Sequence, residues 1–165
     1  PNMSKYKLIP FNQTSLHDAR NKWEAFAGED AFDLEFSGFF EWADKHLTQV
    51  DGDSIALNLH NNDALRTDAI VEVVSSRKGQ MSKLLKVIPS PLFWDVNNSR
   101  EDIVTLYTEV FFNVLTSHGF GSSRTVKLYG RDDEMMSILR SIHSLWSIPN
   151  TKAEFEGRFL TFTLN

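Results

Sequence analysis

The stretch from Met81 to Gly119 constrains the fold most, because it joins an apolar strand to a long amphipathic helix through a short polar link. We expect the strand over residues 84–88, ended by Pro89, and the helix to begin after Ser99, whose hydroxyl suits an N-cap. Mixed α/β folds place ligands where a strand leads to a helix N-terminus, since free backbone N–H groups and the helix dipole meet there. The sequence therefore predicts a site at this junction.

The composition and net charge of the chain limit the number of domains and the kinds of partner to expect. The 165 residues, 41% of them hydrophobic, contain no linker-like stretch, which predicts one domain over residues 1–165. We expect Pro1 and Asn2, ahead of Met3, to be a cloning remnant. A net charge of −5 without a basic cluster argues against nucleic acid as a partner. The apolar runs are too short for a membrane span, so we expect a cytoplasmic protein without a membrane partner.

Metal and disulfide chemistry are not expected from this sequence. The chain has no cysteine, which excludes a disulfide framework and thiolate metal ligands. The histidines show no metal-ligand spacing on one helix; they are His17, His46, His60, His118 and His143. We therefore expect no metal site, and the sequence leaves open whether the protein forms a homodimer.

Hydrophobic periodicity predicts the remaining elements and the fold class. A period of two indicates strands and a period near 3.6 indicates helices, with turns at the polar and glycine-containing links. The expected elements are strand 6–9, helix 16–27 capped by Thr14-Ser15, helix 36–50, strands 54–60, 69–74 and 84–88, a helix from Ser99 to Gly119, strand 125–129, helix 132–146 and two short strands around a turn at 156–158. The order β-α-α-β-β-β-α-β-α-β-β predicts an α/β (α+β) fold, a mixed and mostly antiparallel sheet flanked by helices.

This order resembles that of the GNAT family of N-acetyltransferases over the whole chain. Val87, Ile88 and Pro89 stand where that family often has Val-x-Pro at the end of its fourth strand. The resemblance implies that this tripeptide lies where two strands diverge, the second being strand 125–129 in parallel orientation. It also implies that Ser99 and Arg100, at the following helix N-terminus, help to hold the pyrophosphate of acetyl-CoA.

The loop after Pro89 departs from the family pattern. The family has Arg/Gln-x-x-Gly-x-Gly/Ala there, whereas residues 91–98 of this chain contain no glycine. Pro91 lacks an N–H that a phosphate would need, and the bulky side chains that follow hinder a close approach to the backbone. We therefore interpret the chain as a divergent member with a degenerate acetyl-CoA loop, and we expect weak or absent binding of acetyl-CoA.

Three side chains are candidates for removing a proton from an amine. Glu72 occupies a polar position of strand 69–74, where the family commonly has a Glu in this role, and an outward-facing strand carboxylate is the equal alternative. His60 and His143 are candidates because histidine titrates near neutral pH, although surface or hydrogen-bonded structural histidines are the more common case. Trp42 lies off the centre of its apolar helix stripe, and we favour helix-flank packing over the lining of a groove.

Two hypotheses of function follow. The first is an acyl-CoA-dependent N-acyltransferase in which Glu72 or His60 takes the proton of an amine, either a small molecule or a protein amine. The second is a non-catalytic binding or regulatory module that has kept the fold and lost the pyrophosphate loop, since a fold does not determine a function. The sequence does not identify the amine.

The acidic start of the helix after Ser99 gives a test of cofactor binding. Glu101 and Asp102 place two negative charges on its first turn, where each would oppose a phosphate by about 0.3–1 kcal/mol. The double change Glu101→Gln with Asp102→Asn should therefore tighten acetyl-CoA binding at low salt in a calorimetric titration. Submicromolar binding to the unmodified protein would contradict this expectation. No binding to either form would favour steric blockage by residues 91–94 and a non-catalytic role.

Overall fold

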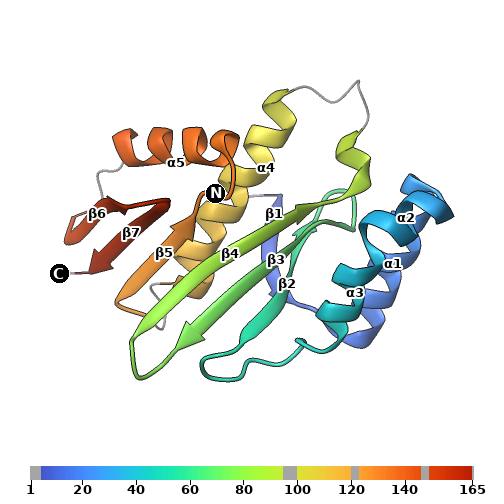
Figure 1. The fold of residues 1–165 in the computed structure, drawn as a ribbon, viewed down its shortest axis with the longest axis horizontal. Coiled ribbons are helices and arrows are strands. Elements are labelled where there is room, and N and C mark those ends of the chain that lie inside the picture. The colour runs from blue at the N-terminus through green and yellow to red at the C-terminus, as the bar shows by residue number, and fades with distance from the viewer. Residues whose placement is uncertain (1–4, 95–99, 120–122, 146–148, 165) are drawn as a thin grey trace.

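A computed structural model describes residues 5–94, 100–119, 123–145 and 149–164. Within these residues, seven strands form one sheet in the order β1-β2-β3-β4-β5-β7-β6 (Figure 1). The elements are β1 (Tyr6–Pro10), α1 (Gln13–Ala27), α2 (Glu29–Glu35), α3 (Ser37–Asp44), β2 (Ser54–Asn61), β3 (Arg66–Ser76), β4 (Met81–Pro89), the 3-10 turn η1 (Pro91–Trp94), α4 (Arg100–Asn113), the π-helix η2 (Val114–Gly119), β5 (Thr125–Tyr129), α5 (Asp133–Leu145), β6 (Thr151–Glu156) and β7 (Phe159–Leu164). The predicted fold class is confirmed.

The sheet is antiparallel except at one junction. Strands β1 to β4 pair antiparallel in chain order, β4 pairs parallel with β5, and β5, β7 and β6 again pair antiparallel. Helices α1 to α3 gather beside one end of the sheet, and α5 with β6 and β7 lies at the other, with β4 running between them (Figure 1). The parallel orientation predicted for strands 84–88 and 125–129 is confirmed.

Two hydrophobic clusters cover the two faces of the sheet. Val71 and Val87 belong to the cluster that joins α4 and α5 to the sheet, whereas their neighbours Ile70 and Ile88 belong to the aromatic cluster under α1 to α3. Successive strand residues point to opposite faces, so these four residues show that β3 and β4 are covered on both sides. Burial on both faces therefore fixes the register of β3 and β4.

The N-terminal helices differ from the prediction in two respects. Helix α1 begins at Gln13, because Asn12, and not Thr14-Ser15, is the N-cap: its side chain accepts the Ser15 N–H at 2.8 Å, and the Ser15 hydroxyl accepts the Asn12 N–H at 3.0 Å. The single helix expected over residues 36–50 is wrong. Helix α2 ends before Phe36, and α3 ends at Asp44.

A bond to the sheet explains the early end of α3. The N–H groups of Lys45 and His46 bond three residues back, to Trp42 and Ala43, which tightens the last turn. The carbonyl of His46 then accepts the N–H of Ala56 on β2 at 2.8 Å. Tertiary pairing thus overrides an apolar period that continues along the sequence.

A buried carboxylate fastens the end of the sheet at which β4 finishes. Asp68 is fully buried and is the extra residue of a β-bulge in β3, because Leu59 pairs with Ala69 while His60 pairs with Thr67. Its side chain accepts hydrogen bonds from three groups, and its carbonyl accepts a fourth from the backbone that follows β4. The donors are the Tyr6 hydroxyl at 2.8 Å, Asn61 Nδ2 at 3.0 Å, Arg66 Nε at 2.6 Å and the Ser90 N–H at 2.9 Å.

The hydrogen bond from Tyr6 to Asp68 should contribute to stability in a pH-dependent way. Burial, and then the hydrogen bond to Asp68, raise the pKa of the Tyr6 phenol. Tyr6→Phe should lower the free energy of unfolding by about 1.5–3 kcal/mol at pH 7, the range for a hydrogen bond to a charged group. A raised pKa in the folded state means that this contribution is complete below about pH 10 and is lost as the pH rises further. Urea unfolding of both proteins at several pH values measures the difference, and a constant difference from pH 7 to pH 11 would contradict the linkage.

Candidate functional site

Strand β4 pairs with β5 along its first half alone. The parallel register runs from Met81–Thr125 to Leu84–Leu128, whereas pairing with β3 continues to Pro89. Leu85 is the extra residue of a second β-bulge, since Val73 pairs with Leu84 and Glu72 pairs with Lys86. A bulge bends its strand and re-aims the side chains beyond it. The ladder to β5 thus ends before residues 87–89, one residue short of the end of β5 at Tyr129.

Residues 87–89, beyond the end of the β4–β5 ladder, can offer a ligand their backbone groups more readily than their side chains. Val87 is buried toward α4 and α5, and Ile88 is buried toward α1 to α3, so both side chains fill the core. The ladder to β5 ends before these residues, which leaves the backbone groups on that edge of β4 without a β5 ladder partner in the described part of the chain. Such an edge can form hydrogen bonds with an extended ligand.

The loop after Pro89 forms a closed turn of 3-10 helix. Ser90 is buried, its hydroxyl accepts the Leu92 N–H at 3.2 Å, and its carbonyl accepts the Phe93 N–H at 3.0 Å. Trp94, 52% exposed, stacks on Phe36 with ring centroids 5.1 Å apart. The amides of Leu92 and Phe93 are therefore both bonded to Ser90, and Trp94 packs the loop against Phe36 at the end of α2.

The helix start presents more negative than positive charge. Glu101 and Asp102 occupy the first turn of α4, as expected. The side chain of Arg100 is 80% exposed, and its Nε lies 3.5 Å from Oε1 of Glu134 on α5. Ser99, the predicted N-cap and cofactor contact, lies outside the described residues.

The phenol of Tyr107 on α4 lies near carboxylates at the start of α5. Tyr107 is partly buried against the cluster formed by α4 and α5. Burial, and then the carboxylates of Asp132 and Glu134, raise the pKa of its phenol. The phenol therefore stays protonated at neutral pH. Tyr107 could not be identified from the sequence, because its charge environment comes from residues more than twenty positions along the chain.

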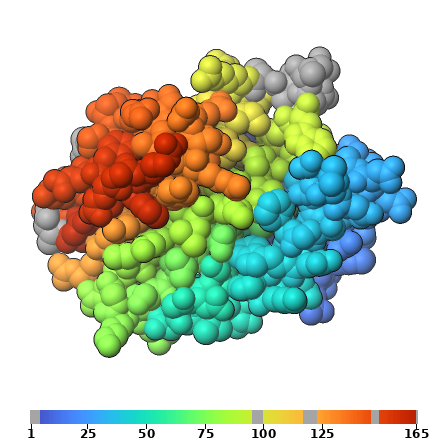
Figure 2. Space-filling model, viewed as in Figure 1, coloured from blue at the N-terminus to red at the C-terminus, as the bar shows by residue number. Residues whose placement is uncertain are grey.

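Glu72 lines a pocket of about 500 Å³ between the sheet and the N-terminal helices. The lining consists of Leu34, Glu35, Gly38, Phe39, Trp42, Glu72, Lys86 and Ile88. Oε2 of Glu72 accepts a hydrogen bond from the Ser54 hydroxyl at 2.7 Å, which fixes the carboxylate. A volume of this size suits a small organic molecule. The surface of β4 beside this pocket lies between α2–α3 and the C-terminal elements (Figure 2).

Two pocket residues were not expected to take part in a site. Lys86 faces Glu72 across the β3–β4 pair, and its ammonium lies 5.2 Å from the centroid of the Phe39 ring. Trp42 lines the pocket and stacks on His46 with ring centroids 4.8 Å apart, so the favoured prediction of helix-flank packing alone is incomplete. These residues reach the pocket because of the β3–β4 register and because α2 and α3 are separate helices that meet at Phe36. The sequence pattern revealed neither feature.

The two candidate histidines lie away from Glu72. His60 is on β2, four residues beyond Ala56, the partner of Glu72, and is thus separated from it by roughly 13 Å along the strand. Nε2 of His143 lies 3.0 Å from the carbonyl oxygen of Ala153, and the ring packs edge-on against Phe155. Of the three predicted bases, the structure places Glu72 in the pocket.

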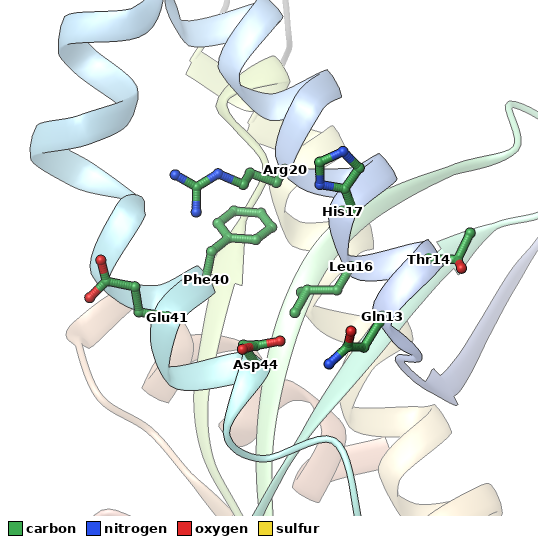
Figure 3. Close-up of a pocket in the computed structure, with 8 residues that line it drawn as sticks. All are labelled: Gln13, Thr14, Leu16, His17, Arg20, Phe40, Glu41 and Asp44. Carbon is green, nitrogen blue, oxygen red and sulfur yellow. The ribbon is translucent and has the colours of Figure 1, made fainter.

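A second hollow lies between α1 and α3 on the outside of the helices (Figure 3). Its volume is about 550 Å³, and its lining includes Arg20, Phe40, Glu41 and Asp44. It is larger than the pocket at Glu72, but no residue of β4 or β5 lines it. It therefore has no connection to the opening of the sheet.

The described residues show neither a metal cluster nor a membrane span. No group of three or more His, Asp or Glu side chains in the described ranges is arranged to hold a metal ion. Among the same residues, no helix is both long and apolar enough to cross a bilayer.

Comparison with known proteins places the fold. No protein-family model and no curated protein matches the sequence. Among solved structures, a chimera of the spermidine N-acetyltransferase SpeG from Vibrio cholerae and hSSAT matches with a TM-score of 0.53 at 13% identity, covering 98% of this chain and 96% of that one. A single-residue variant of SpeG from Vibrio cholerae gives 0.50 at 12% identity over 98% and 92%. The chain has a GNAT-like fold. At this identity the likeness shows the GNAT-like fold alone.

A substitution at Ser90, which closes the turn after β4, should lower the stability of the protein. Ser90→Ala removes the buried hydroxyl that accepts the Leu92 N–H, so the free energy of unfolding should fall by about 1–3 kcal/mol. Ser141→Ala is the control, because its exposed hydroxyl bonds within α5 and surface changes stay within about 0.5 kcal/mol. Equal stability of the two variants in urea unfolding would show that Ser90 does not hold the turn.

Proposed function

We propose that this protein is an N-acyltransferase that moves an acyl group from an acyl thioester to an amine held beside Glu72. The observation that carries the proposal is the end of the β4–β5 ladder at Leu84. Lys86 and Ile88, which line the pocket, belong to the segment of β4 that has left β5. The open strand edge and the pocket are therefore two sides of the same five-residue segment. This arrangement supports a donor on the edge and an acceptor in the pocket.

Acyl-CoA is the donor that a GNAT-like fold implies, and the residues fit one end of it. The free edge of β4 beyond Leu84 suits the extended thioester arm, whose amides can pair with backbone groups. The described part of the loop offers less to the nucleotide end. The Leu92 and Phe93 amides are bonded to Ser90, and Arg100 is paired with Glu134. In this proposal the thioester arm, and not the nucleotide, makes the contacts that position the donor.

In this proposal Glu72 acts on the amine. An ammonium must lose a proton before its nitrogen attacks a carbonyl carbon, and a carboxylate within hydrogen-bond reach can take that proton. The bond from Ser54 to Oε2 holds the Glu72 carboxylate in place. Phe39 and Trp42 line the pocket beside it and give the reacting groups an apolar wall.

As part of the same proposal, the protein acts in the cytoplasm as a single domain, alone or as a homodimer.

A non-catalytic binding module is the second candidate. The closed 3-10 turn favours it, because the amides of Leu92 and Phe93 are bonded to Ser90 and are not directed at a phosphate. In that case the Glu72 pocket would serve for binding without transfer.

Thiol release from acetyl-CoA, measured with spermidine and with L-phenylalanine as acceptors, separates the two functions. With an accepted amine, Glu72→Gln should lower kcat by about 10²–10⁴-fold, the usual contribution of a general base. Glu154→Gln is the matched control, because Glu154 lies on the outer strand β6 and pairs with Lys152 outside the pocket. No thiol release with either amine, together with no thermal shift on addition of acetyl-CoA, would reject the transferase and support the binding module.

A further inference from the structure

We propose that the pocket beside Glu72 selects an amine that also carries a carboxylate, an α-amino acid with an apolar side chain, and that Lys86 binds the carboxylate. The proposal rests on the proposed function for taking this pocket as the amine site. It adds the class of acceptor and the residue that determines it.

The pocket contains charges of both signs. Glu35 and Glu72 supply two carboxylates, and Lys86 supplies one ammonium. The contacts observed for the Lys86 ammonium in the described residues are limited to the face of the Phe39 ring, and no carboxylate lies within 4.0 Å of it. An ammonium held only by a ring can turn to an incoming carboxylate, because a charge-assisted hydrogen bond is the stronger interaction.

The spacing of the two groups favours a ligand with closely spaced charges. Glu72 and Lys86 are direct partners in the β3–β4 register, so their Cβ atoms lie on one face about 5 Å apart. An α-amino acid carries its ammonium and carboxylate on the same carbon and can meet both groups at once. A long polyamine would instead bring further positive charge toward Lys86.

The remaining lining fits an apolar side chain. Leu34, Trp42 and Ile88 are apolar lining residues of the same pocket, and the volume of about 500 Å³ leaves room beyond an amino-acid backbone. Glu35, on α2 at the outer rim, lies on the other side of the pocket from the strands. A polar or cationic side chain would lie against these apolar groups.

Binding to the protein without a donor tests the inference directly. The probes are L-phenylalanine, L-phenylalaninamide and phenethylamine, which share the ring and the amine while only the first has a carboxylate. In calorimetric titrations, L-phenylalanine should bind at least 10-fold more tightly than the other two, the effect of one hydrogen bond to a charged group. Lys86→Gln should remove this preference, and Lys86→Arg should keep it.

Lys83→Gln is the matched control. Lys83 lies on the same strand, and its ammonium also stands over a phenylalanine ring, that of Phe159 at 5.9 Å, but it does not line the pocket. Its change should leave the preference for L-phenylalanine intact. Equal affinity of the three probes for the unmodified protein, no binding of any probe, or equal effects of Lys86→Gln and Lys83→Gln would each overturn the inference.

The inference and the proposed function can fail separately. Lys86-dependent binding of L-phenylalanine without thiol release would keep the inference and reject the transferase. Acylation of phenethylamine as fast as of L-phenylalanine, with no effect of Lys86→Gln, would keep the transferase and reject the inference.

Discussion

The extra residue at Leu85 is the constraint on which the site depends. With Val73 opposite Leu84, an unbroken register would set Lys86 opposite Val71 and direct it into the core beneath α4. The bulge instead places Lys86 opposite Glu72 on the face toward α2 and α3. The same bend coincides with the end of pairing to β5. One inserted residue therefore opens the sheet and assembles the charged pair of the pocket.

The other bulge, at Asp68, fastens the end of β4 beyond this point. Its carbonyl holds the Ser90 N–H, while its side chain holds Tyr6 of β1 and Asn61 of β2. The far end of β4 is thus tied to β3 and, through Asp68, to β1 and β2, although no β5 ladder continues beside it. An edge supported in this way needs no rearrangement before a ligand meets it, which lowers the entropic cost of binding.

The fold class and the order of the strands followed from the sequence because most strands and helices have a clear local period, whereas the division of the second helix into α2 and α3 did not. It failed where a distant contact decided the outcome, as at His46, whose bond to Ala56 ends α3 within an unbroken apolar pattern. Glu72 was found through a resemblance in element order. Lys86 was missed because a β-bulge decides which face of the sheet it lies on, and no residue type in the sequence indicates that bulge. His60 was chosen for its chemistry, without knowledge of its position along β2.

The single parallel junction also affects how the chain folds. Strands β2 to β4 and strands β6 and β7 are joined by short hairpins, whereas β4 and β5 are joined across the whole of α4. Contacts between distant segments require closure of a long loop and tend to form after local ones. The β2–β4 meander should therefore fold early and the β4–β5 seam late. Interactions that form late govern how slowly the native state unfolds, so the edge that serves the site also influences the lifetime of the fold.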